Sequence, residues 1–253
     1  MARALMLDLE GTLYTREGAI EGACDAIAFM RENNFAIRFL TNTDSKDNAT
    51  LLEYVSAFGL DIRPEELFTP VNAAAQILTQ ADGCAFVVGT PSITRQLASV
   101  VTVTSEPAEA THVIIGDCRS TLSYDLLDQA FSALVQGAEF LALQRGKFFL
   151  SGGKPHIDTG AIVAALEYAA QCEATVVGKP AQIFLQAAVD SLPQTPAPSD
   201  IWVVGDDATT DIPMGRAFGA TTIQVRTGKF TPEDEGATHV ISSIAALPDL
   251  LGR

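Results

Sequence analysis

Four apolar runs of the chain end in side chains that could carry out phosphoryl chemistry. In chain order they lead into Asp8 and Glu10, into Thr41 and Asn42, into Lys179, and into Asp206 and Asp207, with Asp211 shortly after. An isolated charge at the end of a buried strand is costly, so acids in these places need a compensating partner. A carboxylate nucleophile facing an anionic phosphoryl group has the same need, because a cation must lie between the two. The set therefore suits phosphoryl transfer through an aspartyl-phosphate.

A hard divalent cation fits these side chains. Mg²⁺ binds one or two carboxylates in proteins and completes its octahedron with waters and phosphate oxygens. Lys179 would add a second positive charge, while Thr41 and the backbone amide of Asn42 could hold phosphate oxygens. We therefore expect Mg²⁺ as the cofactor and a phosphorylated molecule as the substrate.

Strand and helix patterns alternate along almost the whole chain, which predicts an α/β fold with an open parallel sheet. Near-continuous apolar runs such as 4–9 are typical of strands buried on both faces. In such sheets, ligands bind beyond the carboxyl ends of the strands. If the strands at 4–8, 35–41, 174–178 and 201–206 are neighbours, their ends bring the candidate residues together. The chain has more strands than one such sheet needs, so we expect a second, smaller α/β unit.

The composition limits the partners of the protein. Its 253 residues include 31 acidic and 16 basic side chains, a formal net charge of −15. This surplus repels phosphate backbones and anionic lipid, so we expect neither nucleic acid nor a membrane as a partner. No apolar stretch approaches the roughly 20 residues of a membrane-spanning helix, and the N-terminus shows no signal-peptide pattern. The four cysteines form no C-x-x-C pair, so we expect reduced thiols in the cytoplasm.

Four motifs in order resemble those of the haloacid dehalogenase-like (HAD) hydrolase superfamily: DLEGTL, FLTN, VVGKP and VVGDDATTDI. The long insertion between the second and third motifs resembles the α/β cap of subclass IIA. The tail IQVRTGKFTPEDE is similar to the phospholysine phosphohistidine inorganic pyrophosphate phosphatase branch. The resemblance implies a Rossmann-like core formed by residues 1–72 and 175–253, and a cap formed by residues 73–174.

The resemblance also implies roles for the residues of the first and second motifs. Asp8 would be the nucleophile and a metal ligand, and the backbone carbonyl of Glu10 would be a second ligand. Thr41 and Asn42 would bind the phosphoryl group.

The third and fourth motifs would complete the site. Lys179 would neutralise charge on Asp8 and on the phosphate, and Asp206 would be the third metal ligand. Asp207 or Asp211 would support the metal-bound waters or Lys179. Asp211 is favoured because it matches the aspartate of the family's T-D-I.

Glu10 departs from the family pattern. Many family phosphatases have an aspartate at this position, which protonates the leaving group and then activates water. Glutamate keeps the acid but is longer by one methylene, and the branch suggested by the tail tolerates non-acidic residues here. Glu10 is therefore either a working acid–base or a spacer that contributes mainly its carbonyl.

Simpler interpretations exist for several of these residues. Thr41 and Asn42 could belong only to a helix N-cap region, Lys179 could be a solvated loop lysine, and Asp206 or Asp207 could cap the following helix. Asp117 in VIIGDC imitates the fourth motif but lies inside the insertion, and we interpret it as structural.

The expected function is Mg²⁺-dependent hydrolysis of a small phosphorylated metabolite through an aspartyl-phosphate on Asp8. Closure of the cap would exclude water and select the leaving group. Two alternatives stay open: a metal- and phosphate-binding member of the family with little or no turnover, and a phosphotransferase or pyrophosphatase using the same site. The resemblance also suggests a homodimer formed through the cap.

Overall fold

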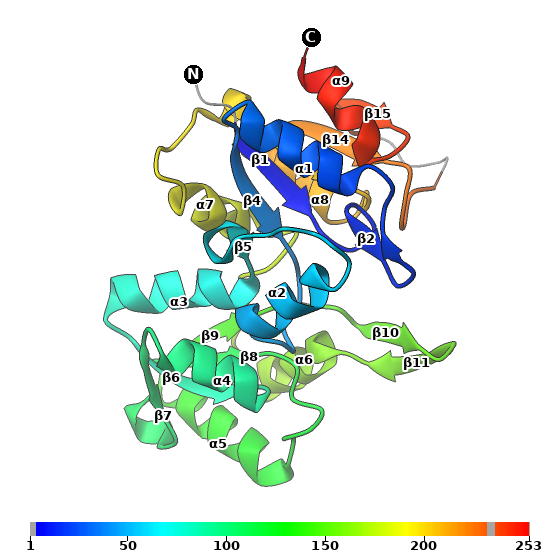
Figure 1. Cartoon of the computed structure of the whole chain (residues 1–253). Helices are drawn as coiled ribbons and strands as arrows, with labels where there is room; N and C mark the ends of the chain where they lie inside the picture. Colours follow the sequence, from blue (N-terminus) through cyan, green and yellow to red (C-terminus); the bar gives the residue numbers. More distant parts are fainter. Residues whose placement is uncertain (1–3, 232–235, 253) are drawn as a thin grey trace. The chain divides into compact units, whose positions relative to one another are not determined.

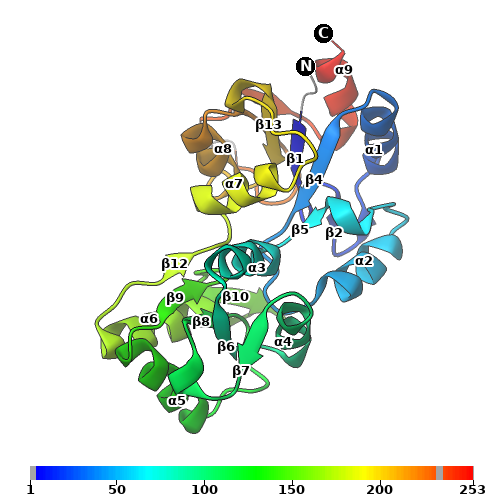
Figure 2. The same cartoon turned by 90° about the vertical axis from the view of Figure 1, so that its left-hand side faces the viewer.

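The computed structural model describes residues 4–231 and 236–252, and the chain divides into two compact units (Figures 1 and 2). The first, called the core unit here, comprises Met1–Thr41, Asn48–Phe68 and Lys179–Arg253. The second, called the inserted unit, comprises Asn42–Asp47 and Thr69–Gly178. The junctions thus lie at 68/69 and 178/179, where the sequence suggested 72/73 and 174/175, and the short segment 42–47 belongs to the inserted unit. The last four residues of the tail motif, 232–235, lie outside the described residues.

The core unit is built on a six-stranded sheet in the order β15-β14-β13-β1-β4-β5. Its strands are β1 (Ala4–Asp8), β4 (Ala36–Leu40), β5 (Leu67–Phe68), β13 (Ile201–Gly205), β14 (Thr221–Val225) and β15 (His239–Ile241). All neighbouring pairs are parallel. Asp8 is in register with Leu40, and Leu7 with Val204, so β1, β4 and β13 end at the same edge of the sheet. The predicted Rossmann-like parallel α/β fold is confirmed.

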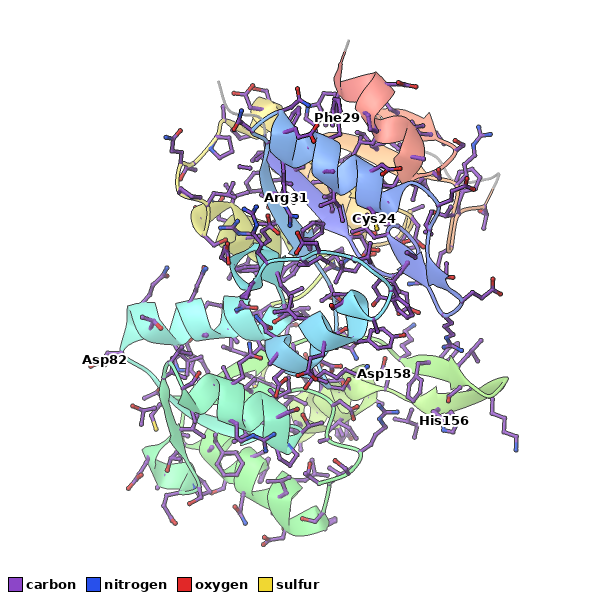
Figure 3. All side chains as sticks on the ribbon, in the orientation of Figure 1. Cys24, Phe29, Arg31, Asp82, His156 and Asp158 are labelled. Atoms are coloured by element: carbon purple, nitrogen blue, oxygen red, sulfur yellow. The ribbon has the colours of Figure 1, made fainter. Side chains whose placement is uncertain are left out.

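Amphipathic helices complete the core unit. They are α1 (Ala23–Glu32), α2 (Asn48–Ser56), α7 (Gln182–Asp190), α8 (Asp211–Phe218) and α9 (Leu247–Leu251), with a small hairpin of β2 (Tyr14–Thr15) and β3 (Gly18–Ala19). Helix α1 buries Ala23, Ala26, Ile27 and Met30, the spacing of one helical face. Burying each large apolar side chain contributes roughly 1.5–3 kcal/mol. The polar Arg31 of the same helix, labelled in Figure 3, pairs with Asp61 at 2.8 Å.

The inserted unit has its own parallel sheet, of five strands in the order β12-β9-β8-β6-β7. The strands are β6 (Cys84–Val88), β7 (Thr102–Thr104), β8 (His112–Ile115), β9 (Glu139–Ala142) and β12 (Thr175–Val176). Its helices are α3 (Pro70–Ala81), α4 (Pro91–Ala98), α5 (Tyr124–Val135) and α6 (Thr159–Ala170). An antiparallel hairpin of β10 (Phe148–Ser151) and β11 (Lys154–Ile157) precedes α6. Short 3₁₀ turns occupy Pro64–Glu66, Pro107–Glu109, Pro198–Asp200 and Ile244–Ala246.

One expectation about the sheet is wrong. The strand that leads to Lys179, β12, pairs with β9 in the inserted unit and is not a neighbour of β1. The strand ends at Val176, three residues before Lys179, so the chain leaves the inserted unit before the lysine and enters the core unit with it. An alternating strand and helix pattern does not show which sheet a strand joins, because both sheets present the same local sequence signal.

Two further observations concern the whole chain. Cys24, Cys84, Cys118 and Cys172 are all free thiols. Among the described helices, none has both the length and the apolar character needed to cross a bilayer.

Candidate active site

The site is centred on Asp8, the last residue of the fully buried strand β1. One of its carboxylate oxygens, Oδ1, accepts a short hydrogen bond from Lys179 Nζ. The other, Oδ2, accepts a hydrogen bond from Thr12 Oγ1 at 3.3 Å. Thr12 is brought back toward Asp8 by the tight turn that follows β1, in which Leu13 N donates to Leu9 O at 2.8 Å. No role was expected for Thr12 from the sequence, and the turn brings its hydroxyl to Asp8.

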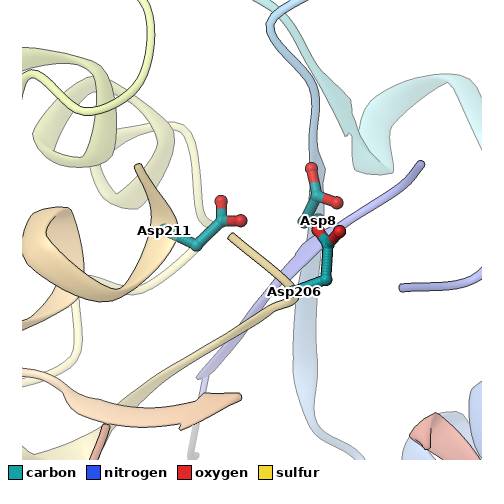
Figure 4. A group of neighbouring side chains, drawn as sticks. All are labelled: Asp8, Asp206 and Asp211. Carbon is teal, nitrogen blue, oxygen red and sulfur yellow. The ribbon is translucent and has the colours of Figure 1, made fainter. Parts of the chain in front are cut away.

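Two more carboxylates lie beside Asp8 (Figure 4). Asp206 follows β13, the neighbour of β1, and Asp211 is the first residue of α8. One carboxylate oxygen from each of Asp8, Asp206 and Asp211 lies within 4.8 Å of the others. Since like charges this close repel, the group requires nearby positive charge.

Lys179 supplies part of that charge. Its side chain is only 4% exposed, and Nζ donates to Asp8 and, at 2.9 Å, to Asp211 Oδ1. Burial by itself would lower the pKa of this lysine, but the adjacent Asp211 and Asp8 carboxylates outweigh it and raise the pKa above its ordinary value. The interpretation of Lys179 as a solvated loop lysine is wrong.

One ammonium group does not balance three buried carboxylates. Burial raises the pKa of Asp8 in spite of Lys179, and burial likewise raises the pKa of Asp206. Burial also raises the pKa of Asp211 to about 6, although Lys179 opposes the shift. Asp211 Oδ2 is buried and has no hydrogen-bond partner among the described residues. A carboxylate oxygen left without a donor beside two other acids is what a site for a hard cation provides.

The loop after β14 fixes the position of Asp206. The backbone N–H of Lys229 donates to Asp206 Oδ2 at 2.6 Å, and Thr227 Oγ1 donates to Gly11 O at 2.5 Å. The loop therefore holds both the acid after β13 and the turn after β1. The signal for this loop in the sequence is RTGK within the tail motif, to which no chemistry was assigned from the sequence.

Two glycines allow this close approach. Gly11 has φ +94°, and a Cβ placed there would lie 2.2 Å from Asp206 Oδ2. Gly228 has φ +65°, and its Cβ would lie 2.1 Å from the same oxygen. Only glycine combines these backbone conformations with room for the carboxylate. The backbone thus approaches Asp206 from two different loops.

Asp207 has a different environment from Asp211. Its side chain accepts from Thr209 N at 2.8 Å and from Lys229 Nζ at 2.8 Å. Burial alone would raise its pKa, but the hydrogen bonds from Lys229 and Thr209 prevail and lower it. Of the two aspartates considered as support for Lys179, Asp211 contacts the lysine, while Asp207 orders the turn before α8.

The remaining candidates lie nearby in the chain. Thr41 is buried directly after β4, and its N–H donates to Phe68 O at 3.3 Å. Asn42 follows it but belongs to the inserted unit. Glu10 is exposed and forms a β-bridge with Tyr14. Its carbonyl as a metal ligand and its carboxyl as an acid–base both stay predictions.

The sequence of this chain is similar to known protein families. The profile of the family described as haloacid dehalogenase-like hydrolase matches residues 5–101, and a HAD-hydrolase-like profile matches residues 176–247. The haloacid dehalogenase-like hydrolase domain-containing protein 2 of Mus musculus is 32% identical over 92% of this chain and 87% of its own. The chain belongs to the haloacid dehalogenase-like hydrolase family. The predicted membership, and with it the prediction of a HAD-like enzyme, is confirmed.

One further relative and two solved structures resemble this HAD-like hydrolase over almost its whole length. The phospholysine phosphohistidine inorganic pyrophosphate phosphatase of Homo sapiens is 30% identical over 98% of this chain and 94% of its own. NagD from E. coli K-12 superposes with a TM-score of 0.85 at 25% identity, covering 96% of this chain and 97% of its own. A p-nitrophenyl phosphatase from Archaeoglobus fulgidus shares the fold, with a TM-score of 0.89 at 23% identity, and the coverage is 98% of this chain and 99% of that one. The predicted similarity to the subclass IIA type is confirmed by these neighbours.

Proposed function

We propose that this HAD-like hydrolase is a Mg²⁺-dependent phosphatase that acts on a small phosphorylated molecule, with Asp8 as the nucleophile. The observation that carries the proposal is the group formed by Asp8, Asp206 and Asp211, joined by Lys179 at the end of the parallel sheet. The names of the relatives, a pyrophosphate phosphatase and a p-nitrophenyl phosphatase among them, support the same class of reaction.

The side chains fit a magnesium ion. In the proposal, Asp8, Asp206 and the backbone carbonyl of Glu10 would hold the ion. Asp211, whose Oδ2 has no hydrogen-bond partner among the described residues, would support the ion or its waters. When bound, Mg²⁺ would neutralise the negative charge that the phosphoryl group brings to the buried acids. Carboxylate, carbonyl and water oxygens are the ligands that this ion prefers.

The proposed reaction has two steps, each a displacement at phosphorus. A carboxylate oxygen of Asp8 attacks phosphorus, the bond from phosphorus to the leaving oxygen breaks, and Glu10 gives that oxygen a proton. Lys179 holds Asp8 in place through Oδ1, while Thr41 and Asn42 bind phosphoryl oxygens. Water then attacks the phosphorus of the aspartyl-phosphate and gives Glu10 a proton, and inorganic phosphate leaves as Asp8 is restored.

The inserted unit would serve as the cap, the role that the sequence suggested for residues 73–174. In the proposal it selects the leaving group and excludes water during the reaction. A cytoplasmic location and a homodimer formed through the cap stay predictions. The similarity to a phospholysine phosphohistidine inorganic pyrophosphate phosphatase supports a second candidate substrate class, namely compounds with a P–N or P–O–P bond.

A phosphatase assay tests the proposal. Turnover of p-nitrophenyl phosphate is measured with Mg²⁺ and with excess chelator, followed by a panel of phosphorylated metabolites that includes pyrophosphate and phosphohistidine. Asp8→Asn is the control, because it keeps the size of the side chain but removes the nucleophile. Rapid quenching with ³²P-labelled substrate should leave acid-stable label on the wild-type protein and none on Asp8→Asn. Wild-type turnover no higher than that of the mutant across the panel would favour the alternative of a binding protein without turnover.

A further inference from the structure

The proposed phosphate-binding pair is divided between the two units. Thr41 ends its core segment directly after β4, whereas Asn42 begins the segment 42–47, which belongs to the inserted unit. The chain then returns to the core unit at Asn48, the first residue of α2. The six residues 42–47, which lie between β4 and α2 of the core unit, therefore belong to the inserted unit. Their hydrogen bonds to the inserted unit explain this assignment.

Three separate places in the inserted unit hold this segment. Asp117 N, after β8, donates to Asp44 O at 3.2 Å, and Thr90 Oγ1, after β6, donates to Ser45 O at 3.1 Å. Thr159 Oγ1, in the first residue of α6, donates to Asp44 Oδ2 at 2.6 Å. Because β6 and β8 are adjacent parallel strands, the segment runs along the carboxyl edge of this second sheet.

The segment is also closely packed at Asn42 and at Asp44. A Cβ on Gly116 would lie 3.1 Å from Asp44 O, and a Cβ on Gly178 would lie 2.5 Å from Asn42 Oδ1. Gly178 immediately precedes Lys179 in the chain. The side chain of Asn42 is therefore held against the residue that leads into the lysine of the site.

The side chain that attaches the segment to α6 is a buried acid, the carboxyl group of Asp44. It is 7% exposed, and burial raises its pKa to about 6, with the Thr159 hydrogen bond opposing the shift. Asp117 and Asp158, the N-cap of α6 that is labelled in Figure 3, add to the rise in pKa. Packing alone does not call for a buried acid beside two others, because an apolar side chain would fill the same space without the desolvation cost. Its hydrogen bond to Thr159 is the specific interaction that such a side chain could not make.

We propose that Asp44 is a positioning residue: it holds the segment 42–47 within the inserted unit and thereby positions Asn42 to bind the phosphoryl group. The inference rests on the proposed function, in which this pair binds the phosphoryl group. Thr159 is the partner through which Asp44 acts.

Paired variants test this role. Asp44→Ala and Thr159→Val each remove the hydrogen bond, whereas Asp44→Asn keeps an acceptor and Thr159→Ser keeps the donor. Val163→Ala is the matched control, because Val163 is fully buried in α6 and belongs to the apolar core cluster of the inserted unit. The readouts are KM and kcat for p-nitrophenyl phosphate, and the inhibition constant of inorganic phosphate.

We expect KM and the phosphate inhibition constant to rise about tenfold in Asp44→Ala and Thr159→Val, with kcat changed less than about twofold, since one hydrogen bond to a charged group is lost. Asp44→Asn, Thr159→Ser and Val163→Ala should stay within about twofold of the wild type in both constants. Constants for Asp44→Ala and Thr159→Val that match those of Val163→Ala would overturn the proposal. So would an equal loss in Asp44→Asn, because this variant keeps the acceptor.

Hydrogen exchange separates this inference from the proposed function. In the wild type the amides of 42–47 should exchange together with those of α6, and in Asp44→Ala they should exchange faster while those of β4 do not change. Segment amides that follow β4 instead would overturn the proposal. If the wild type binds phosphate without turnover, the proposed function fails, and the dissociation constants of the same variants for inorganic phosphate still decide the inference. A wild type that neither turns over substrate nor binds phosphate overturns both.

Discussion

Replacing Lys179 with methionine removes the cation that contacts both Asp8 and Asp211 while keeping an unbranched side chain. The Lys179 side chain is 4% exposed and those of Asp8 and Asp211 are 10% and 3% exposed, so water replaces little of the lost interaction. Breaking a buried ion pair by removing one partner costs about 3–5 kcal/mol, because the other charge is left uncompensated. Since whole domains are stable by only about 5–15 kcal/mol, we expect a large fall in the free energy of unfolding.

The measurement is urea unfolding followed by circular dichroism at pH 8 with chelator present. Lys229→Met is the matched control: this lysine also forms an ion pair, with Asp207 at 2.8 Å, but its side chain is 74% exposed. The ammonium group of this pair is exposed although the Asp207 side chain is only 10% exposed, so loss of the pair should cost about 1 kcal/mol, well below the loss in Lys179→Met. Adding Asp211→Asn to Lys179→Met removes one of the uncompensated carboxylates and should restore about 1–3 kcal/mol.

Two results would refute this reasoning. The first is a Lys179→Met protein that loses no more stability than Lys229→Met, because Lys179 would then be solvated. The second is a double variant that is less stable than Lys179→Met alone, because the uncompensated charge would then not be the source of the loss.

Four further predictions concern the site and its surroundings. Saturating Mg²⁺ should raise the free energy of unfolding of the wild type by about 2.7 kcal/mol at one hundred times the dissociation constant, whereas Asp206→Asn should show less than half of this gain in calorimetry. Gly11→Ala should reduce turnover of p-nitrophenyl phosphate more than tenfold, because φ is +94° and its Cβ would lie 2.2 Å from Asp206 Oδ2; activity near that of the wild type would contradict the close approach. Thr227→Val should weaken Mg²⁺ binding measured by titration calorimetry, since it loses the hydrogen bond to Gly11 O, while Thr227→Ser should not. Asp44→Asn should be more stable than the wild type at pH 8, because the raised pKa of the Asp44 carboxyl, about 6, costs the wild-type protein stability as the pH rises from the ordinary value of 3.8 to about 6, and the full cost remains above that pH. The gain, about 3 kcal/mol at most, should shrink at pH 5 in urea unfolding.

Much of the site followed from local sequence. Asp8 could be found because it ends a run in which every residue is buried, and a charge there needs an explanation. Asp206 and Asp211 could be found because they lie within one short segment after another buried strand. In each case, the acidic side chain and the strand that positions it are neighbours in the chain. The spacing in the sequence was therefore enough to identify the candidate residue.

Other features depend on contacts between distant segments. The backbone N–H of Lys229 holds Asp206, although 23 residues separate them, and Thr227 holds Gly11 across 216 residues. The sequence of side chains does not indicate which backbone N–H groups will donate to a distant carboxylate. A threonine in the sequence likewise does not indicate which carbonyl its hydroxyl will bind. The two glycines at Asp206 are recognisable only once both loops are placed.

The sequence by itself determined the class of chemistry and the parallel α/β architecture, because strand ends, apolar periodicity and acids act locally. The tertiary structure alone decided that β12 belongs to the inserted sheet, that Lys229 N and Thr227 hold Asp206 and Gly11, and that 42–47 belongs with the inserted unit. The physical reason is that sheet membership and hydrogen bonds between distant segments depend on which distant surfaces pack together. Which surfaces pack together depends on the free energy of the whole fold, and local sequence patterns account for only part of that free energy.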